Sequence, residues 1–527
     1  MKKNYFVFCF LILSVILHAE DGYRLWLRYD KIDDPTLLKE YRTDIAGIQF
    51  ISNSPTLSVA KQELLNDLSS LLNKKFLDQP TIADKFIVAG TPLTSAVIKT
   101  FLSPGNFNLG KEGFVISTKN IDGENLILIA ANSDVGVLYG VFEFLRLLQT
   151  HQSIKKIDIL SVPKIQNRIL DHWDNLNRTI ERGYAGISIW NWHLLPGYID
   201  KRYLDYARAD ASIGINGVVL TNVNANSLTL TKEYLIKVKA LADVFRPYGI
   251  KVYLTPRFSA PIDLGNLKTA DPLDADVQNW WKQKVNEIYS YIPDFGGFLV
   301  KANSEGQPGP QTYNRTHADG ANMFANALAP HNGIVMWRAF VYDVRVQKSN
   351  ENFGEGKIDP NAPTIASADR AKQAYNEFKP FDGKFRKNVL IQVKNGPIDF
   401  QPREPFSPLF GAMPQTPLMV EFQLTQEYLG QATNLVFEAP LFKECLDADT
   451  YANGKGSTVA KVIDGTIENY SITGIAGVAN IGNERDWTGH LFGQANWYAF
   501  GRLAWDHDLS SAQIADEWLR QTFSNDP

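Results

Sequence analysis

The stretch NVLIQVKNGPIDF, residues 388–400, begins as a run of apolar residues and ends in polar ones. Lys394 and Asp399 stand on either side of an Asn-Gly-Pro sequence, which is typical of the end of a strand. A strand that is apolar on both faces indicates a parallel sheet covered by helices on both sides. The charged residues then lie at the edge of the sheet, where a functional site can be built.

Seven other segments repeat this pattern, and helical stretches separate them. They are NRILDHWDN (167–175), INGVVLTNVN (215–224), IKVYLTPRF (250–258), GGFLVKANSEG (296–306), GIVMWRAFVY (333–342), LMVEFQLTQEY (418–428) and, with the weakest pattern, SITGIAGVANIG (471–482). Eight strands alternating with helices between residues 162 and 500 predict an α/β fold of the (β/α)8 TIM-barrel type. The active site of such a barrel lies at the carboxyl ends of its strands.

The chain before the barrel has a different texture. Residues 20–161 mix helical patterns, such as SVAKQELLNDLSSLL (58–72), with strands such as KFIVAG (85–90), and predict a smaller α/β domain. Residues 1–19, MKKNYFVFCFLILSVILHA, place two lysines before an apolar run that ends in Ala19, which is typical of a signal peptide. We therefore expect an exported protein, periplasmic or extracellular, that is not held in a membrane after the leader is removed.

Charge and cysteine content exclude several classes of function. Loss of the leader removes Lys2 and Lys3 and no acid, so the formal net charge changes from −4 to −6 and gives no basic surface for nucleic acid. Cys445 is the single cysteine after the leader, so neither a disulfide framework nor a cysteine metal site is expected. The eight histidines show no ligand spacing, and no Gly-x-Ser-x-Gly elbow for acyl transfer is present.

Charged residues gather at the predicted ends of strands four to seven. These residues are Lys301 and Glu305, Arg338, Lys394 and Asp399, and Glu427. Paired carboxylates at the end of a barrel suit glycoside hydrolysis, in which one acid protonates the leaving oxygen and a carboxylate activates water or attacks directly. The three cations exceed what that chemistry needs, and they indicate a sugar that itself carries a carboxylate, a uronic acid.

Each of these residues also has a structural alternative. Asp399 and Glu427 could equally cap helices or form salt bridges, and the cations could serve only to neutralise the acids. Aromatic residues such as Trp190, Trp192 and the pair at 280–281 are more typical of packing than of sugar platforms. The convergence of the charges on one end of the barrel favours the functional interpretation.

Six motifs resemble the α-glucuronidases of glycoside hydrolase family 67. They are DHWDN (171–175), ERGYAG (181–186), KANSEGQPGP (301–310), MWRAF (336–340), KNGPIDFQPREPFSPLFGAMP (394–414) and TQEYLGQ (425–431). The resemblance runs from Asp21 to the end of the chain. It implies removal of α-1,2-linked glucuronic acid, or its 4-O-methyl ether, from xylooligosaccharides, with inversion and without a cofactor or metal.

The resemblance also implies roles for individual residues. Glu305 corresponds to the family's general acid, and Asp399 and Glu427 to its water-activating carboxylates. Lys301, Arg338 and Lys394 correspond to the groups that hold the uronate carboxylate and ring. Trp173 and Val223 correspond to positions in the pocket wall.

Two features depart from the family pattern. The polar segment 347–372 between strands five and six is longer than the resemblance implies and is predicted to be a surface loop at the rim of the site. Residues 501–527 are predicted to begin a helical carboxyl-terminal region that is incomplete, and the family's dimer contact is expected only where that region is whole. A glycosidase of other specificity and a non-catalytic uronate-binding remnant therefore stay open as alternatives.

Overall fold

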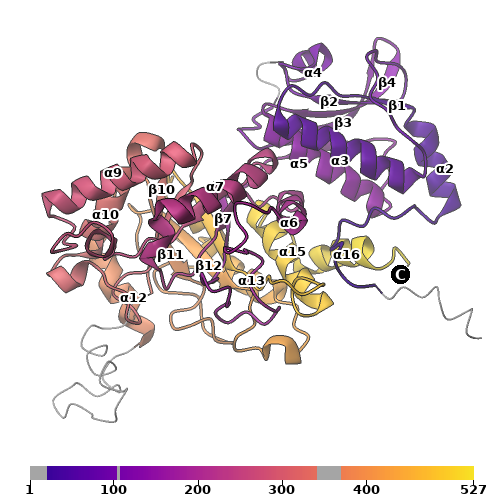
Figure 1. Ribbon diagram of the computed structural model, residues 1–527. Helices are drawn as coiled ribbons and strands as arrows, with labels where there is room; N and C mark the ends of the chain where they lie inside the picture. Colours follow the sequence, from indigo (N-terminus) through magenta and orange to yellow (C-terminus); the bar gives the residue numbers. More distant parts are fainter. Residues whose placement is uncertain (1–19, 104–106, 341–369, 527) are drawn as a thin grey trace, which may run out of the picture.

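The computed structural model describes residues 20–103, 107–340 and 370–526. The predicted signal peptide, 1–19, and most of the polar segment 347–372 lie outside these ranges. Figure 1 shows a smaller domain built from the first part of the chain, in indigo and purple, beside a larger one built from the rest. Within the described ranges no helix combines the length and the apolar character needed to cross a bilayer.

The amino-terminal domain is a mixed five-stranded sheet with helices on both faces. Its strands, in the order β1-β2-β4-β3-β5, are β1 (Gly47–Gln49), β2 (Phe86–Gly90), β4 (Glu124–Ala131), β3 (Phe114–Ile121) and β5 (Asp158–Ser161). Its helices are α2 (Pro35–Asp44), α3 (Pro55–Leu72), α4 (Ala96–Phe101) and α5 (Asp134–Gln149). α3 begins where the Ser54 hydroxyl accepts from the backbone N–H of Leu57, and it ends at Asn73 in the left-handed conformation.

α5 joins this domain to the barrel. It is buried along most of its length because it packs against β3 and β4 of the sheet and also against the larger domain. The ring of Tyr139 lies edge-on to Trp505 at a centroid distance of 5.1 Å. Arg168 at the start of the barrel donates to Glu112 at 2.8 Å. The two domains therefore share one continuous apolar core.

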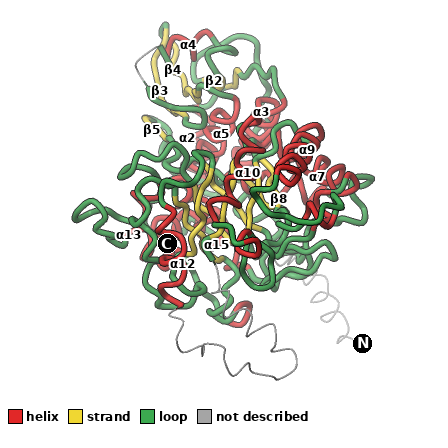
Figure 2. Tube along the Cα trace, turned by 90° about the vertical axis from the view of Figure 1, so that its left-hand side faces the viewer, coloured by secondary structure: helices red, strands yellow, loops and turns green. Residues whose placement is uncertain are grey.

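The larger domain is a closed barrel of eight parallel strands, seen as yellow strands enclosed by red helices in Figure 2. The strands are β6 (Asn167–Asp171), β7 (Gly217–Val219), β8 (Lys251–Leu254), β9 (Gly297–Val300), β10 (Ile334–Arg338), β11 (Val389–Lys394), β12 (Leu418–Gln423) and β13 (Gly474–Val478). β13, which has the weakest sequence pattern, pairs with both β12 and β6 and closes the barrel. The predicted TIM barrel, preceded by a smaller α/β domain, is confirmed.

Helices surround the barrel and continue past its last strand. They are α6 (Lys201–Ser212), α7 (Lys232–Phe245), α8 (Ala260–Asp263), α9 (Ala275–Tyr291), α10 (His317–Leu328), α12 (Arg370–Phe378), α13 (Ala439–Asp447), α14 (Val459–Ile463), α15 (Leu491–Trp505) and α16 (Ser511–Thr522). α15 packs against β6 and runs through residue 500, where the sequence places the end of the barrel. The predicted domain limits stay predictions.

The inside of the barrel is apolar in its middle and charged at its carboxyl end. Ile169, Val219, Leu299 and Met419 belong to a cluster of inward-facing side chains. The strands approach closely, and at Gly297 a Cβ atom would lie 1.9 Å from the carbonyl oxygen of Ile334. The close approach of β9 and β10 thus explains why glycine stands there.

Above this apolar layer, Arg338 and Glu421 form an almost fully buried ion pair. Arg338 Nε lies 2.9 Å from one carboxylate oxygen of Glu421, and Nη2 lies 2.7 Å from the other. Beside them, Gln392 donates to Asp171 at 2.7 Å. Burial, and then the charge of Glu421, hold the pKa of Asp171 well above its usual range. This shift favours the protonated form of Asp171 beside the ionised Arg338–Glu421 pair.

Loss of Arg338 alone should destabilise the barrel, because it leaves the Glu421 carboxylate buried without a cation. We expect Arg338→Leu to lower the free energy of unfolding by about 3 to 5 kcal/mol, and the double variant Arg338→Leu/Glu421→Leu to recover most of that loss. Urea unfolding followed by tryptophan fluorescence measures both. The control is Arg182→Leu, which removes an arginine whose side chain is 51% exposed. A single variant as stable as the wild type would show that the pair does not support the fold.

Candidate active site

The charged residues predicted from the sequence meet at the carboxyl end of the barrel, here called the barrel mouth. Arg338 ends β10 and Lys394 ends β11, while Lys301 directly follows β9. Glu305 lies in a tight loop after β9, in the left-handed conformation with φ of 49°. The Asn303 side chain holds this loop by accepting from the backbone N–H of Gln311 at 3.0 Å.

The first cation at the mouth, Lys301, contacts Glu305. The Lys301 side chain is only 2% exposed, whereas that of Glu305 is 43% exposed. Lys301 Nζ also donates to Asn224 Oδ1 at 2.8 Å. Burial raises the pKa of Glu305, but the ammonium of Lys301, with Lys394 and Arg338 further away, lowers that pKa more, to a value below its usual range. Glu305 is thus ionised at neutral pH in the ligand-free protein.

The second pair joins Lys394 to Asp399. Lys394 Nζ contacts the Asp399 carboxylate and lies 3.3 Å from the centre of the Phe340 ring. Tyr428 donates its hydroxyl to the other oxygen of Asp399 at 2.8 Å. Burial raises the pKa of Asp399, while the Lys394 ammonium lowers it more, so that Asp399 is ionised. Burial, and then the charge of Arg338, lower the pKa of Lys394 to about 8.

The loop that carries Asp399 is held by Glu404. Its carboxylate accepts from the backbone N–H groups of Ile398, Asp399 and Gln401 at 2.7 to 2.9 Å. A Cβ atom at Gly396 would lie 2.3 Å from a Glu404 oxygen. The sequence NGPIDFQPRE therefore combines a residue without a side chain with the acid that organises the turn, and this arrangement presents Asp399 to the barrel mouth.

The third carboxylate, Glu427, has partners of its own. Arg182 Nε lies 3.0 Å from one oxygen, and Gln423 donates to the other at 2.9 Å. Arg182 comes from the ERGYAG segment after β6 and reaches across from the neighbouring side of the barrel. Its backbone, with φ of 64°, is left-handed. Glu427 thus lies beside a cation that differs from those of Glu305 and Asp399.

Arg338, Trp173 and Val223 lie deeper in the barrel. Two donor nitrogens of Arg338 are taken by Glu421, and Nη1 has no hydrogen-bond partner among the residues that the structure describes. The Trp173 ring lies 5.5 Å from the Arg338 guanidinium carbon. Trp173 and Val223 are both buried in the inward-facing apolar cluster. The predicted place of Trp173 and Val223 in the pocket wall stays a prediction.

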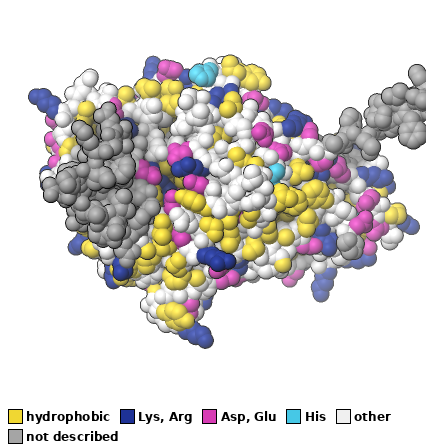
Figure 3. Space-filling model, turned by 90° about the horizontal axis from the view of Figure 1, so that it is seen from below, with side chains coloured by type: hydrophobic (Ala, Val, Ile, Leu, Met, Phe, Trp, Pro, Cys, Tyr) yellow, Lys and Arg dark blue, Asp and Glu magenta, His cyan; other side chains and the backbone are white. Residues whose placement is uncertain are grey.

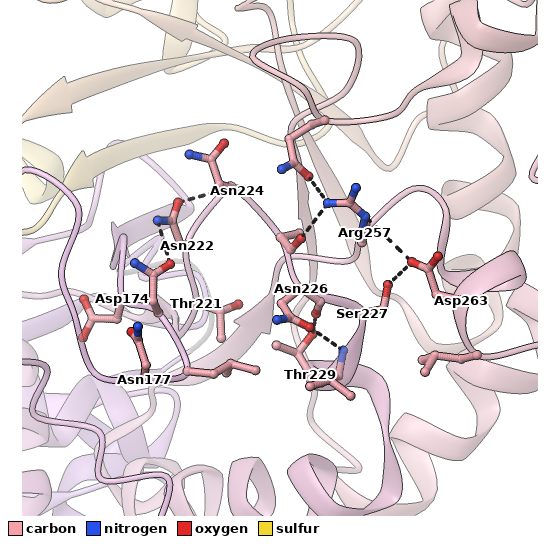
Figure 4. Close-up of a pocket in the computed structure, with 16 residues that line it drawn as sticks. Asp174, Asn177, Thr221, Asn222, Asn224, Asn226, Ser227, Thr229, Arg257 and Asp263 are labelled. Carbon is pink, nitrogen blue, oxygen red and sulfur yellow. Dashed lines mark hydrogen bonds and ion pairs between the residues drawn. The ribbon is translucent and has the colours of Figure 1, made fainter. Parts of the chain in front are cut away.

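A large cavity adjoins the mouth on the side of β6, β7 and β8. Its volume is about 720 Å³, and its lining includes the amides of Asn222 and Asn224 and the guanidinium of Arg257, all labelled in Figure 4. Asn224 links the cavity to the site because its side chain also contacts Lys301. Glu181 accepts from the amides of both Asn222 and Asn224 at 2.8 Å.

Sequence reasoning missed the residues that hold the charged groups in place. These are Glu181, Arg182, Asn224, Glu404, Glu421, Gln423 and Tyr428. Glu421 offered a readable signal, because an acid in the middle of the buried strand LMVEFQ needs a buried cation. Arg182 lies within a motif that carried the family resemblance, but its sequence gives no indication that it contacts Glu427.

The arrangement can perform acid and base catalysis on a bound anion. Glu305 comes from the β9 side, and Asp399 and Glu427 come from the loops after β11 and β12, so an acid and two potential bases approach the mouth from different strands. In the part of the chain that the structure describes, no three His, Cys, Asp or Glu side chains group in a way that would hold a metal ion. On the face drawn in Figure 3, basic and acidic side chains are interspersed and form no continuous basic patch.

Profiles of known families match almost the whole chain. The profile of the glycosyl hydrolase family 67 middle domain matches residues 147–487. The profile of the N-terminus of the same family matches residues 25–144, and the profile of its C-terminus matches residues 488–527. Among curated proteins, alpha-glucuronidase A of Emericella nidulans is 41% identical over 98% of this chain, and the alpha-glucuronidase of Hypocrea jecorina is 40% identical over 98%. The matched part is 60% of the length of each of these relatives.

Solved structures with low sequence identity share the fold. A family GH138 enzyme targeting pectin rhamnogalacturonan II aligns with a TM-score of 0.52 at 15% identity, covering 90% of this chain and 52% of its own. A family GH115 4-O-methyl-alpha-glucuronidase aligns with a TM-score of 0.51 at 13% identity, covering 90% and 59%. The family profiles and the curated relatives confirm the resemblance seen in the sequence: this chain belongs to glycosyl hydrolase family 67.

Proposed function

We propose that the chain carries the catalytic site of an α-glucuronidase that removes α-1,2-linked glucuronic acid, or its 4-O-methyl ether, from xylooligosaccharides with inversion. The observation that carries this proposal is the meeting of Lys301, Arg338 and Lys394 with three candidate catalytic carboxylates at one barrel mouth. Cations in that number suit a sugar that bears a carboxylate. The names of the curated relatives, alpha-glucuronidase A and alpha-glucuronidase, support the α-glucuronidase part of this proposal.

In the proposed reaction the uronate carboxylate lies among Lys301, Lys394 and the Nη1 group of Arg338. Glu305 gives a proton to the glycosidic oxygen as the bond to the sugar breaks. A water molecule attacks from the opposite face, and Asp399 or Glu427 takes its proton. Tyr428 and Arg182 hold these two carboxylates in position. The reaction needs no group beyond the side chains and water.

The setting of this activity is also part of the proposal. The predicted signal peptide at residues 1–19 supports export to the periplasm or the cell exterior. The chain spans 60% of the length of the two curated relatives. The proposed activity of the whole protein therefore rests on this part, which contains Lys301, Glu305, Arg338, Lys394, Asp399 and Glu427.

The role of Glu305 can be tested by changing the leaving group. Glu305→Gln should slow the removal of glucuronic acid from a xylooligosaccharide by about 10² to 10⁴-fold, because the sugar oxygen leaves poorly without a proton. The same variant should lose much less on an activated aryl α-glucuronide, whose phenolate leaves unprotonated. Asp399→Asn and Glu427→Gln are the matched comparison and should slow both substrates. Steady-state rates decide, and an equal loss of Glu305→Gln on both substrates would contradict the acid role.

The stereochemical outcome tests the proposed single displacement. Because a water molecule must fit between the acid and the base, their carboxyl groups should be about 6.5 to 9.5 Å apart, and the first product should be β-glucuronic acid. Proton NMR during the first minutes of hydrolysis, before mutarotation, identifies the anomer. First-formed α-glucuronic acid would exclude inversion.

Binding of glucuronate should weaken at alkaline pH, because the pKa of Lys394 is lowered to about 8. The ammonium is present below that pH and is lost as the pH rises through it, so affinity should fall by roughly tenfold per pH unit above it at most. Calorimetric titrations between pH 6 and 10 measure this. Lys394→Arg, which stays charged, should remove the fall near pH 8. A wild-type affinity that is constant over this range would rule out the contribution of Lys394.

A further inference from the structure

The ligand-free barrel mouth holds its proposed acid in the wrong protonation state. A general acid must carry a proton before the glycosidic bond breaks. Glu305 instead contacts the Lys301 ammonium, which stabilises the carboxylate form. Something in the catalytic cycle must therefore change the surroundings of Glu305 before it can act.

Lys301 is held in place, whereas Glu305 is held only by Lys301. The Lys301 side chain is buried, and Asn224 accepts from its ammonium while Glu181 holds the Asn224 amide. Among the residues that the structure describes, Lys301 is the single side chain that hydrogen-bonds to the Glu305 carboxylate. A competing anion would thus displace Glu305 and leave Lys301 where it is.

The charges at the mouth are already balanced without a ligand. Each of three cations contacts one carboxylate, and the pairs are Lys301–Glu305, Arg338–Glu421 and Lys394–Asp399. An ionised uronate is then a surplus negative charge in a partly buried site, which is unfavourable unless a proton enters with it. Glu181, which faces Lys301 through Asn224, adds to the negative side.

The three paired carboxylates differ in the hydrogen bonds that remain to them if a bound anion replaces them beside their cation. Glu421 is buried with both oxygens on Arg338, and its pairing is part of the barrel. Asp399 keeps the hydroxyl of Tyr428. Glu305 keeps no hydrogen bond from any other side chain in the described part of the chain, so it is the group on which a proton is most favourable.

We propose that binding of the substrate's own carboxylate protonates the general acid, a change here called the arming step. The uronate binds Lys301 in place of Glu305, and Glu305, left without its cation, takes up one proton from solvent. This inference rests on the proposed function and deepens it. The proton bound on entry is the one that Glu305 gives to the leaving oxygen. The proton of the attacking water passes to Asp399 or Glu427 and returns to solvent, so that protons balance over the cycle.

The arming step makes Lys301 a specificity-determining residue as well as a binding one. A neutral hexose that enters the mouth brings no anion, so Lys301 stays on Glu305 and the acid stays ionised. Discrimination against neutral glycosides then occurs in the catalytic step in addition to binding.

The test is the number of protons taken up when glucuronate binds. Calorimetric titration of the 527-residue chain with glucuronate at about pH 6, in buffers of different ionisation enthalpy, gives that number directly. We expect about half a proton or more per bound glucuronate, since catalytic acids are tuned close to the working pH. Glu305→Gln should bind glucuronate with almost no uptake, whereas Asp399→Glu, which keeps the negative charge beside Lys394, should keep the wild-type uptake.

Each outcome separates the inference from the proposed function. Binding of glucuronate without proton uptake, or uptake that persists in Glu305→Gln, would overturn the arming step and leave the proposed function standing. Uptake changed in Asp399→Glu but kept in Glu305→Gln would assign the proton to the other carboxylate and also overturn it. Failure of the wild type to bind glucuronate at all would overturn both.

Discussion

Three cationic side chains lie buried at the carboxyl end of the barrel, and each needs a carboxylate beside it. A buried charge without a partner costs several kcal/mol, so the pairs that Lys301, Arg338 and Lys394 form constrain every strand that contributes to them. The Arg338–Glu421 pair joins β10 to β12 inside the barrel. The other two pairs lie nearer to solvent and couple a strand end to its own loop.

The same requirement connects the fold to the chemistry. A barrel could fill its carboxyl end with apolar side chains, as it fills its middle, and would gain stability by doing so. The charged layer instead provides ammonium groups at a shallow depth, supported from below by the Arg338–Glu421 pair. In the proposed mechanism, an entering carboxylate meets cations that are already desolvated and oriented, and Glu305, released from Lys301, becomes available for proton transfer.

Local patterns of apolar and charged residues in the sequence were sufficient to predict the barrel and several residues of its mouth. Each strand has an apolar core and a charged or amide end, and Lys301, Glu305, Lys394 and Asp399 could be assigned to the barrel mouth from that pattern alone. The partner of Arg338 could not, because Glu421 is 83 residues away and reaches it only when the barrel closes. Glu404 and Asn224 were missed for a similar reason: they act through hydrogen bonds to loops whose conformation the sequence does not display.

The central claim is that these cations select a substrate by its carboxylate, and one comparison tests it most directly. It is the ratio of kcat/KM for two substrates with the same xylobiose leaving group, one bearing α-1,2-linked glucuronic acid and the other α-1,2-linked glucose. We expect the glucuronide to be preferred by at least about 10²-fold, because the glucoside leaves the buried cations without a carboxylate from the substrate. Equal values for the two substrates would contradict it.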